Sequence, residues 1–511
     1  MRPYSKADIL TIYKRLVRIA CDYANVRKWH KASDFLSSAA SWAYQFNYFY
    51  RDDEAESLIK RISESQVMPV RITSPEENRI VLIDSFCFDN RGLTQQYLRA
   101  MIQNEAELLY ICTATTLESG SDILSELGKY PKARTLLFGG EKVNSIEIAN
   151  RVEEEVARYA PSHIFLHIAP WDMAALLACS AISGSTIYNI NLTDHAFWLG
   201  ASIIDYNIEF RPYGMTVSLE KRRLKPEQLL QQPFYPVAPI SHPFKGFPQM
   251  PDDAVKVFTG GALYKILGKN DIFFRLMEAV LSISPHVYIL IAGFDSSAIF
   301  DEKCSKVRGG DRILQLGFRD DIDAVFQECD IFLSTYPTSG GLMCQYAAKY
   351  KKPILAYRDA DDVENAVEEM VNHYSNGCKS HTDFNQFLDY ARELILDKVF
   401  RQHEGDAMHK GLMTAEAFAE SFPRLVSSHT KQWDWSCDHI DYDAFSSHYL
   451  ELENKNGFAA TKALVSRGGL TLLLKLKGFR LQFLPCLLSA IRDVPLGRLP
   501  HIIGKRIGLF R

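Results

Sequence analysis

Short apolar runs that alternate with helical segments constrain the fold of this chain more than any other feature. Consecutive Val, Ile, Leu and Phe residues are typical of strands buried on both faces, as in parallel sheets whose crossover connections are helices. The runs cover residues 80–84, 107–112, 135–138, 163–168 and 185–190, then 255–259, 286–292, 313–317, 330–334 and 353–356. The sequence therefore predicts an α/β protein with two doubly wound, Rossmann-like sheets.

A proline-rich connection separates the two series of strands. Residues 226–251 include Pro233, Pro236, Pro239, Pro243 and Pro248. Because proline fixes φ and removes a backbone donor, such a stretch favours an interdomain linker. The expected divisions are a helical element at 1–70, an α/β domain at 76–225, a linker at 226–252, a second α/β domain at 253–430 and an extension at 431–511.

Two glycine-containing turns follow strands of the second series. Residues 258–266 contain Gly260, Gly261 and Lys265, and residues 334–341 contain Thr338, Ser339, Gly340 and Gly341 before a helical segment. Glycine lets the backbone approach a ligand closely, and the first N–H groups of a helix have no internal partner. Two such turns at neighbouring strand ends, with one lysine, predict a pocket for a diphosphate.

The N-terminal residues, 5 to about 65, read as helices because Ile9, Ile12, Leu16 and Ile19 recur at helical spacing. Such helices serve either packing and homo-oligomerisation or acceptor binding.

The composition is globular, with 47% hydrophobic and 23% charged residues. Ten scattered cysteines without a CxxC pair favour a reduced, cytosolic compartment. Neither a signal peptide nor a membrane span is expected from the apolar runs.

Several segments, in order, resemble the glycosyltransferase B fold, and in particular the O-GlcNAc transferase type and bacterial enzymes that build surface polysaccharides. The similarity spans roughly residues 76–380. It is carried by the Leu-Tyr-Lys-Ile segment at 263–266 with the strand of 284–293, by the turn at 334–341, and by Trp-Leu-Gly at 198–200 with Asp-Tyr at 205–206. The resemblance implies an acceptor side at 76–225 and a nucleotide-sugar side at 253–430.

The resemblance also implies roles on the donor side. Lys265 would neutralise the β-phosphate as the sugar leaves, and Thr338, Ser339, Gly340 and Gly341 would bind the same diphosphate. Among residues 359–364, Asp361 would hold the ribose hydroxyls. Further donor-binding residues are Gly260, Gly261, Tyr264, Gly317 and Phe318, of which the last two would contact the base.

The acceptor side offers several candidate catalytic groups. His167, Asp194 and His195 end buried runs, where an imidazole or carboxylate could take the acceptor's proton. Buried histidines satisfied by backbone groups are the alternative. Further residues that would contact the acceptor are Arg91, Gly92, Asp172 and Trp198.

Departures from related families narrow the chemistry. Residues 340–353 contain no glutamate, whereas retaining enzymes of this fold often carry a glutamate pair there, so inversion is favoured. A long helical-repeat array is absent, which puts a protein acceptor in doubt. The DxD triplet at 359–361 belongs to the expected ribose loop. We therefore expect no metal and no cofactor beyond the nucleotide-sugar co-substrate.

The C-terminal residues are strongly basic. Residues 461–511 hold ten Lys or Arg and one Asp, a net charge of +9, which leaves −13 for the rest of a chain whose net charge is −4. Leucine and phenylalanine between the lysines are compatible with an amphipathic helix on an anionic membrane surface. A helix that packs back on the protein is the alternative. No nucleic-acid module appears.

The sequence thus predicts a cytoplasmic glycosyltransferase, peripherally bound to the inner face of the plasma membrane. It would move a hexosyl or N-acetylhexosaminyl group from a nucleotide diphosphate, UDP favoured, to a lipid-linked or polysaccharide acceptor in bacterial lipopolysaccharide or capsule assembly. The alternatives are a protein glycosyltransferase, a nucleotide-sugar epimerase of the same fold, and a non-catalytic scaffold of a glycan-assembly complex.

Overall fold

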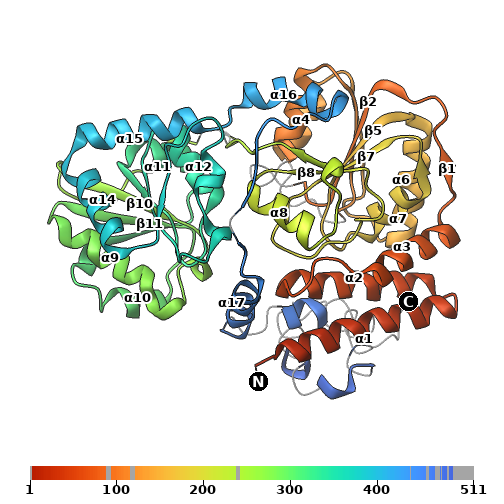
Figure 1. The fold of residues 1–511 in the computed structure, drawn as a ribbon, viewed down its shortest axis with the longest axis horizontal. Helices are drawn as coiled ribbons and strands as arrows, with labels where there is room; N and C mark the ends of the chain where they lie inside the picture. The colour runs from red at the N-terminus through yellow and green to blue at the C-terminus, as the bar shows by residue number, and fades with distance from the viewer. Residues whose placement is uncertain are drawn as a thin grey trace. The chain divides into compact units, whose positions relative to one another are not determined.

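The computed structural model divides the chain into two compact units (Figure 1). Unit 1 comprises residues 1–209, 214–230 and 442–511, and unit 2 comprises residues 210–213 and 231–441. The structure describes residues 3–87, 94–114, 121–237, 242–437, 439–455, 460–465, 472, 475–479 and 483–486. The chain therefore leaves unit 1 and returns to it, and the predicted linear domain boundaries stay predictions.

Unit 1 begins with three helices, α1 (Lys6–Asn25), α2 (Trp29–Phe46) and α3 (Asp53–Gln66), which pack on one another (Figure 1). Ser5 and Asp8 form a capping box at the start of α1, and the Asp52 carboxylate accepts two backbone N–H bonds at the start of α3. These caps satisfy donors that a helix start leaves unpaired. The predicted N-terminal helices are confirmed, and α2 and α3 also contact the α/β part of unit 1 through α6 (Ser145–Tyr159) and α7 (Met173–Ala181).

The sheet of unit 1 has seven strands in the order β4-β3-β2-β5-β7-β8-β9. Their bounds are β2 Glu76–Asp84, β3 Glu107–Cys112, β4 Ala133–Leu137, β5 Pro161–His167, β7 Thr186–Ile190, β8 Tyr206–Glu209 and β9 Leu229–Gln231. The pairs from β4 to β8 are parallel. The strand order reverses beside β2, between β3 and β5, which is where sheets of this kind bind ligands.

Shorter elements complete unit 1. Helices α4 (Thr94–Gln103), α5 (Ser121–Lys129) and α8 (Pro212–Glu220) connect strands, and β1 (Val70–Arg71) pairs with β6 (Ile182–Ser183). A single turn of 3-10 helix, η1 (Pro226–Gln228), precedes β9, and α17 (Tyr442–Lys455) follows the return of the chain.

The described residues of the basic tail pack on the N-terminal helices. Leu472, Leu476 and Phe483 are fully buried. The Arg15 guanidinium lies over the Phe479 ring, 5.9 Å from its centroid. The apolar side of these residues is therefore covered by protein, as in the alternative that the tail packs back. Of the helices that the structure describes, none combines the length and hydropathy needed to cross a bilayer.

Unit 2 holds a six-stranded parallel sheet in the order β12-β11-β10-β13-β14-β15. The strands are β10 Val255–Gly260, β11 Val287–Ala292, β12 Ile313–Gly317, β13 Ile331–Leu333, β14 Ile354–Tyr357 and β15 Ser380–His381. All ten predicted strands of the two sheets are present, and β8, β9 and β15 were not predicted.

Helices cover both faces of this second sheet. One core joins strand residues such as Val257 to α9 (Ile272–Ile283), α10 (Ala298–Cys304) and α14 (Phe384–Leu396). The other joins Phe258 and its neighbours to α11 (Ile322–Glu328), α12 (Gly341–Lys349), α13 (Glu368–Val371) and α15 (Lys398–Gly411). Adjacent strand residues point to opposite cores, which explains why each run is apolar throughout. Helix α16 (Ala415–Ser427) follows α15.

Candidate functional site

The carboxyl edge of the unit 2 sheet is built from glycines. The Gly293 N–H donates to the Gly317 carbonyl at 3.0 Å, and the Gly261 N–H donates to the Ala292 carbonyl at 3.0 Å. Gly293 has a φ of +107°, and a Cβ there would lie 2.6 Å from the Gly261 carbonyl oxygen. The ends of β10, β11 and β12 therefore meet backbone to backbone, which only glycine permits.

The two predicted phosphate turns come together at this edge. Lys265 closes a 3-10 turn, η2 (Leu263–Lys265), and its Nζ donates to the Ser339 carbonyl at 3.0 Å. The Thr338 N–H donates to the Lys265 carbonyl at 3.3 Å. A Cβ on Gly340 would lie 3.8 Å from the Gly260 carbonyl oxygen. Gly261 contacts the same lysine, since a Cβ on it would lie 3.3 Å from Lys265 Cδ.

Lys265 is held in an unusual electrostatic setting. Burial lowers the pKa of Lys265, and the charges of Cys344 and Glu364 offset part of that effect. Within the described residues, the hydrogen bond that its ammonium donates runs to a neutral carbonyl. Removing an ammonium from water without pairing it with a carboxylate costs free energy. An anion that binds beside Lys265 would offset this cost and would therefore be stabilised there.

The start of α12 adds backbone donors. Gly340 is its N-cap and supplies no side-chain cap, so the first N–H groups of this nine-residue helix are open to an anion. The preceding turn is fixed from below, because the Asn365 side chain accepts the Ser339 N–H at 2.8 Å and the Thr335 hydroxyl donates to the Thr338 carbonyl at 2.7 Å. Gly341 opens the helix. The arrangement is a pre-formed anion cradle.

The other predicted donor residues end or follow strands of the same sheet, β10, β12 and β14. Tyr264 and Phe318 are exposed aromatics, and Gly317 has a φ of +65° with open space beside it. Asp361 is exposed, whereas Glu364 is the carboxylate whose charge acts on Lys265. Asp359, two residues before Asp361, pairs with Lys269 instead. Among the described residues no group of three His, Cys, Asp or Glu could hold a metal ion.

Unit 1 carries a buried Asp–His pair at the ends of β2 and β5. His167 Nδ1 lies 3.0 Å from Asp84 Oδ1, and the carboxylate also accepts bonds from Thr94 and Tyr110. Burial raises the pKa of Asp84, but the bonds from His167 and its other donors outweigh burial and lower it. With Nδ1–H held by a carboxylate, Nε2 is the basic nitrogen; it is buried and has no hydrogen-bond partner in the described part of the chain.

Asp84 is a residue that sequence reasoning missed as a functional candidate, although it was recognised as the end of a strand. A carboxylate at the end of an otherwise apolar strand was the available signal. Its partner lies 83 residues away in sequence, so only the sheet register, which pairs Asp84 with His167, shows the connection.

Asp172 has a structural task. Its Oδ1 accepts the N–H groups of Ala174 and Ala175 at the start of α7, and its Oδ2 accepts the hydroxyls of Ser85 and Thr113. The carboxylate therefore links the ends of β2 and β3 to a helix start.

Asp194 and His195 lie together at 3.3 Å, after β7. Asp194 is fully buried, while the His195 ring stays partly exposed and stacks on Tyr449 with ring centroids 6.1 Å apart. Trp198 is 5% exposed, and the Arg222 guanidinium lies over its ring. Trp198 is thus a core residue in this structure. Arg91 and Gly92 lie outside the described residues.

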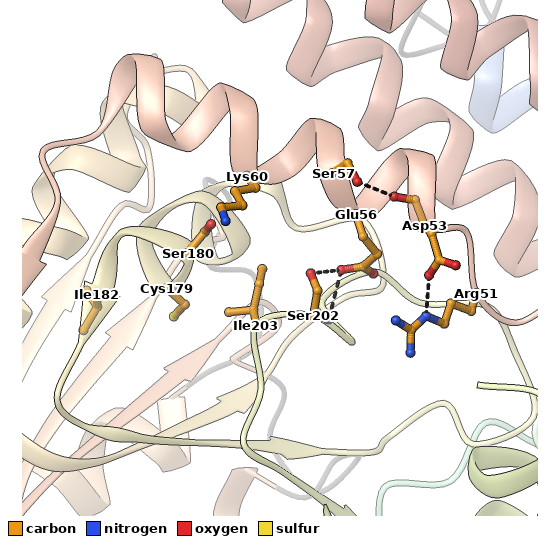
Figure 2. A pocket seen from close by; sticks show the side chains of 10 residues that line it. All are labelled: Arg51, Asp53, Glu56, Ser57, Lys60, Cys179, Ser180, Ile182, Ser202 and Ile203. Carbon is orange, nitrogen blue, oxygen red and sulfur yellow. Dashed lines mark hydrogen bonds and ion pairs between the residues drawn. The ribbon is translucent and has the colours of Figure 1, made fainter. Parts of the chain in front are cut away.

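Glu56 of α3 anchors the Trp-Leu-Gly segment. Its carboxylate accepts the N–H groups of Gly200, Ala201 and Ser202 and the Ser202 hydroxyl. Figure 2 shows this contact beside a cavity of about 500 Å³ that α3, the end of α7 and this loop enclose. The cavity also carries Arg51 and Lys60. The N-terminal helices are therefore fixed to the sheet by a charge-assisted contact.

Comparisons with known proteins concern the fold. No protein-family model and no curated protein match the sequence. A glycosyltransferase from Rickettsia africae is similar in structure with a TM-score of 0.50, at 11% identity over 69% of this chain and 99% of that one. A mutant O-GlcNAc transferase of Thermobaculum terrenum has a TM-score of 0.49 and 13% identity over 86% of this chain and 83% of that one. A putative UDP-N-acetylglucosamine 2-epimerase from Listeria monocytogenes has a TM-score of 0.47 and 12% identity over 69% and 97%.

Two Rossmann-like parallel sheets in two units, together with the likeness to the rickettsial glycosyltransferase, identify the glycosyltransferase B fold. The predicted fold class is confirmed. At such low identity the likeness says nothing of activity, which has to be argued from the residues.

Proposed function

We propose that this chain is a glycosyltransferase that moves a sugar from a nucleotide diphosphate, a UDP-sugar in preference, to a glycan acceptor. The observation that carries the proposal is Lys265. It is a desolvated ammonium beside a glycine edge and an uncapped helix start, and in the described part of the chain it bonds to a backbone carbonyl and to no carboxylate. A transferred sugar leaves a diphosphate behind, and such a group requires a positive charge and backbone donors placed in advance.

The proposed reaction is a direct displacement. The acceptor hydroxyl oxygen forms a bond to the anomeric carbon, the bond from that carbon to the β-phosphate oxygen breaks, and its electron pair stays on the diphosphate. Lys265 and the N–H groups at the start of α12 stabilise that charge. The hydroxyl proton passes to a basic group on the acceptor side; the candidate in unit 1 is His167, whose Nδ1–H is held by Asp84 and whose Nε2 is buried without a hydrogen-bond partner among the described residues. A single displacement inverts the anomeric configuration.

A thermal-shift panel of UDP, GDP, CDP and dTDP tests the donor class. One diphosphate should raise the melting temperature, since ligands that bind only the native state stabilise it. Turnover of the matching nucleotide sugar with and without glycan acceptors then distinguishes the alternatives. Release of nucleotide only when an acceptor is present supports a transferase, and free sugar without acceptor indicates an epimerase. If no diphosphate binds, the proposed enzyme activity is excluded and a non-catalytic scaffold is the remaining alternative.

The proposed acceptor is lipid-linked or polysaccharide glycan of the bacterial surface, reached at the cytoplasmic face of the membrane. The basic excess in residues 461–511 supports this. Because the large apolar side chains described in this tail are buried, apart from Leu484, its membrane contact would be mainly electrostatic and sensitive to salt. Sedimentation with phosphatidylglycerol vesicles at low salt, but not with phosphatidylcholine vesicles or at high salt, is expected. Equal sedimentation with both lipids would contradict it, and modified proteins in expressing cells would favour a protein acceptor.

A further inference from the structure

A second cavity of unit 1 lies where the strand order of its sheet reverses. Its volume is about 510 Å³, within the ~300–1,000 Å³ usual for ligand pockets. Ser85 follows β2, Thr113 follows β3 and Ala169 follows β5, so three neighbouring strand ends contribute to it. The carboxyl edge at such a reversal is the usual ligand position in parallel sheets.

The opposite wall comes from the N-terminal helices. Ser33, Asp34 and Ser37 of α2 line the cavity, and Trp171 and Asp172 line it from the start of α7. The Ser37 hydroxyl donates to the Trp171 carbonyl at 3.0 Å, which ties the two walls together. The cavity therefore exists only because α2 packs over the sheet edge.

The hydroxyl hydrogens of this cavity are mostly committed to protein acceptors. Ser85 and Thr113 donate to Asp172, and Ser37 donates to Trp171. What these groups can still present is oxygen lone pairs. A ligand that fits must therefore bring donors, as sugar hydroxyl and ammonium groups do.

The charges of the cavity wall also favour a ligand without anionic groups. Asp34 is accessible to solvent, yet desolvation by the surrounding protein raises its pKa, as expected for a side chain inside a concavity. Its carboxylate makes no hydrogen bond or ion pair within the described residues. None of the described lining residues is Lys, Arg or His. The charges of His30 and Lys31, which do not line the cavity, offset part of this effect on Asp34. A phosphate or uronic acid would still meet the two carboxylates of the cavity wall with no cation among its described lining residues.

We propose that this cavity binds a saccharide without anionic groups, either a neutral sugar or an amino sugar, with Asp34 selecting for the ammonium form. Trp171, one of the lining residues, is the aromatic residue of the kind that sugar rings pack against. This inference rests on the proposed function in one respect, namely that the bound saccharide is the end of the acceptor. It assigns α2 a binding role beside its packing role.

The test uses the full chain and three methyl glycosides, of glucose, glucosamine and glucuronic acid, observed by saturation-transfer NMR. The glucose and glucosamine glycosides should bind and the glucuronide should not. Ser37→Trp should fill the cavity and abolish binding. Ser57→Trp is the matched control, because Ser57 lines the other unit 1 cavity, of about 500 Å³.

A second variant tests the inference even if Ser37→Trp does not fold. Asp34→Asn changes an accessible helix side chain and should weaken the glucosamine glycoside about fivefold, the effect of one charge at partly solvated range, while leaving the glucose glycoside unchanged. The inference is overturned if neither sugar binds, if the glucuronide binds equally well, or if Ser57→Trp acts like Ser37→Trp. The UDP thermal shift of the same samples reports donor binding by unit 2 independently. Glycoside binding without a UDP shift would therefore contradict the proposed function and leave this inference standing.

Discussion

Replacing Lys265 by methionine should stabilise the free protein and weaken its diphosphate binding. The side chain is desolvated, burial lowers its pKa, and among the residues that the structure describes its ammonium donates to the Ser339 carbonyl alone. Methionine keeps the aliphatic length and removes the charge. Replacing a poorly compensated buried charge by an apolar group is worth about 1–2 kcal/mol. For a unit of this size the melting temperature should therefore rise by ~2–8 °C.

The ligand effect has the opposite sign. A charge-assisted hydrogen bond is worth about 1.5–3 kcal/mol, so its loss should weaken UDP binding about ten- to hundredfold. At a UDP concentration of 100 times the dissociation constant, the wild-type protein gains about 2.7 kcal/mol. The Lys265→Met protein would then gain only ~0.4–1.4 kcal/mol at that same concentration.

Differential scanning fluorimetry with and without UDP measures both effects. Because the folded-state pKa of Lys265 lies below its ordinary 10.5, the stability cost is full below the lowered pKa and disappears as the pH rises towards 10.5. The gain from methionine should shrink accordingly at high pH. Lys379→Met, at an exposed lysine of unit 2, is the control and should change neither quantity. A lower melting temperature together with an undiminished UDP shift would refute the argument.

Three further predictions concern the strand ends. His167→Gln keeps a donor for Asp84 but removes the basic nitrogen, so sugar transfer should fall by about 10²–10⁴-fold with the UDP thermal shift intact; unchanged turnover would exclude His167 as the base. Burial raises the pKa of Glu209 to about 7, so the contribution of this residue to stability is full below pH 4.5 and is lost as the pH rises through 7. In Glu209→Gln the free energy of unfolding in urea should therefore vary less with pH over that range. A pH dependence equal to that of the wild type would contradict this prediction. Gly293→Ala places a Cβ 2.6 Å from a carbonyl oxygen. Gly317 also has a positive φ but has open space beside it, so Gly317→Ala should lower the free energy of unfolding by only ~1 kcal/mol, and Gly293→Ala by at least twice as much. Equal losses of stability in urea titrations would contradict this prediction.

The local pattern was sufficient for the sheets and for the two glycine turns that we propose bind a diphosphate. Buried parallel strands must be apolar on both faces, so their runs are visible without tertiary information. The glycines and Lys265 stand close together in sequence, within residues 258–266. Strand β8 escaped prediction because it buries polar residues. The Asn207 amide pairs with Asn189, and Glu209 accepts from Asn191, each 18 residues apart.

The sequence by itself determined the βα alternation, the two sheets and the turns that form the anion cradle, since each depends on the order of neighbouring residues. Tertiary structure alone decided which distant side chains meet. It paired Asp84 with His167, seated Glu56 of α3 on the Gly200 loop, and brought Asp34 of α2 to the same cavity as Trp171. These contacts depend on strand order and helix packing, which no local pattern encodes. The candidate donor site could thus be predicted from sequence, whereas the cavity that we propose for the acceptor could not.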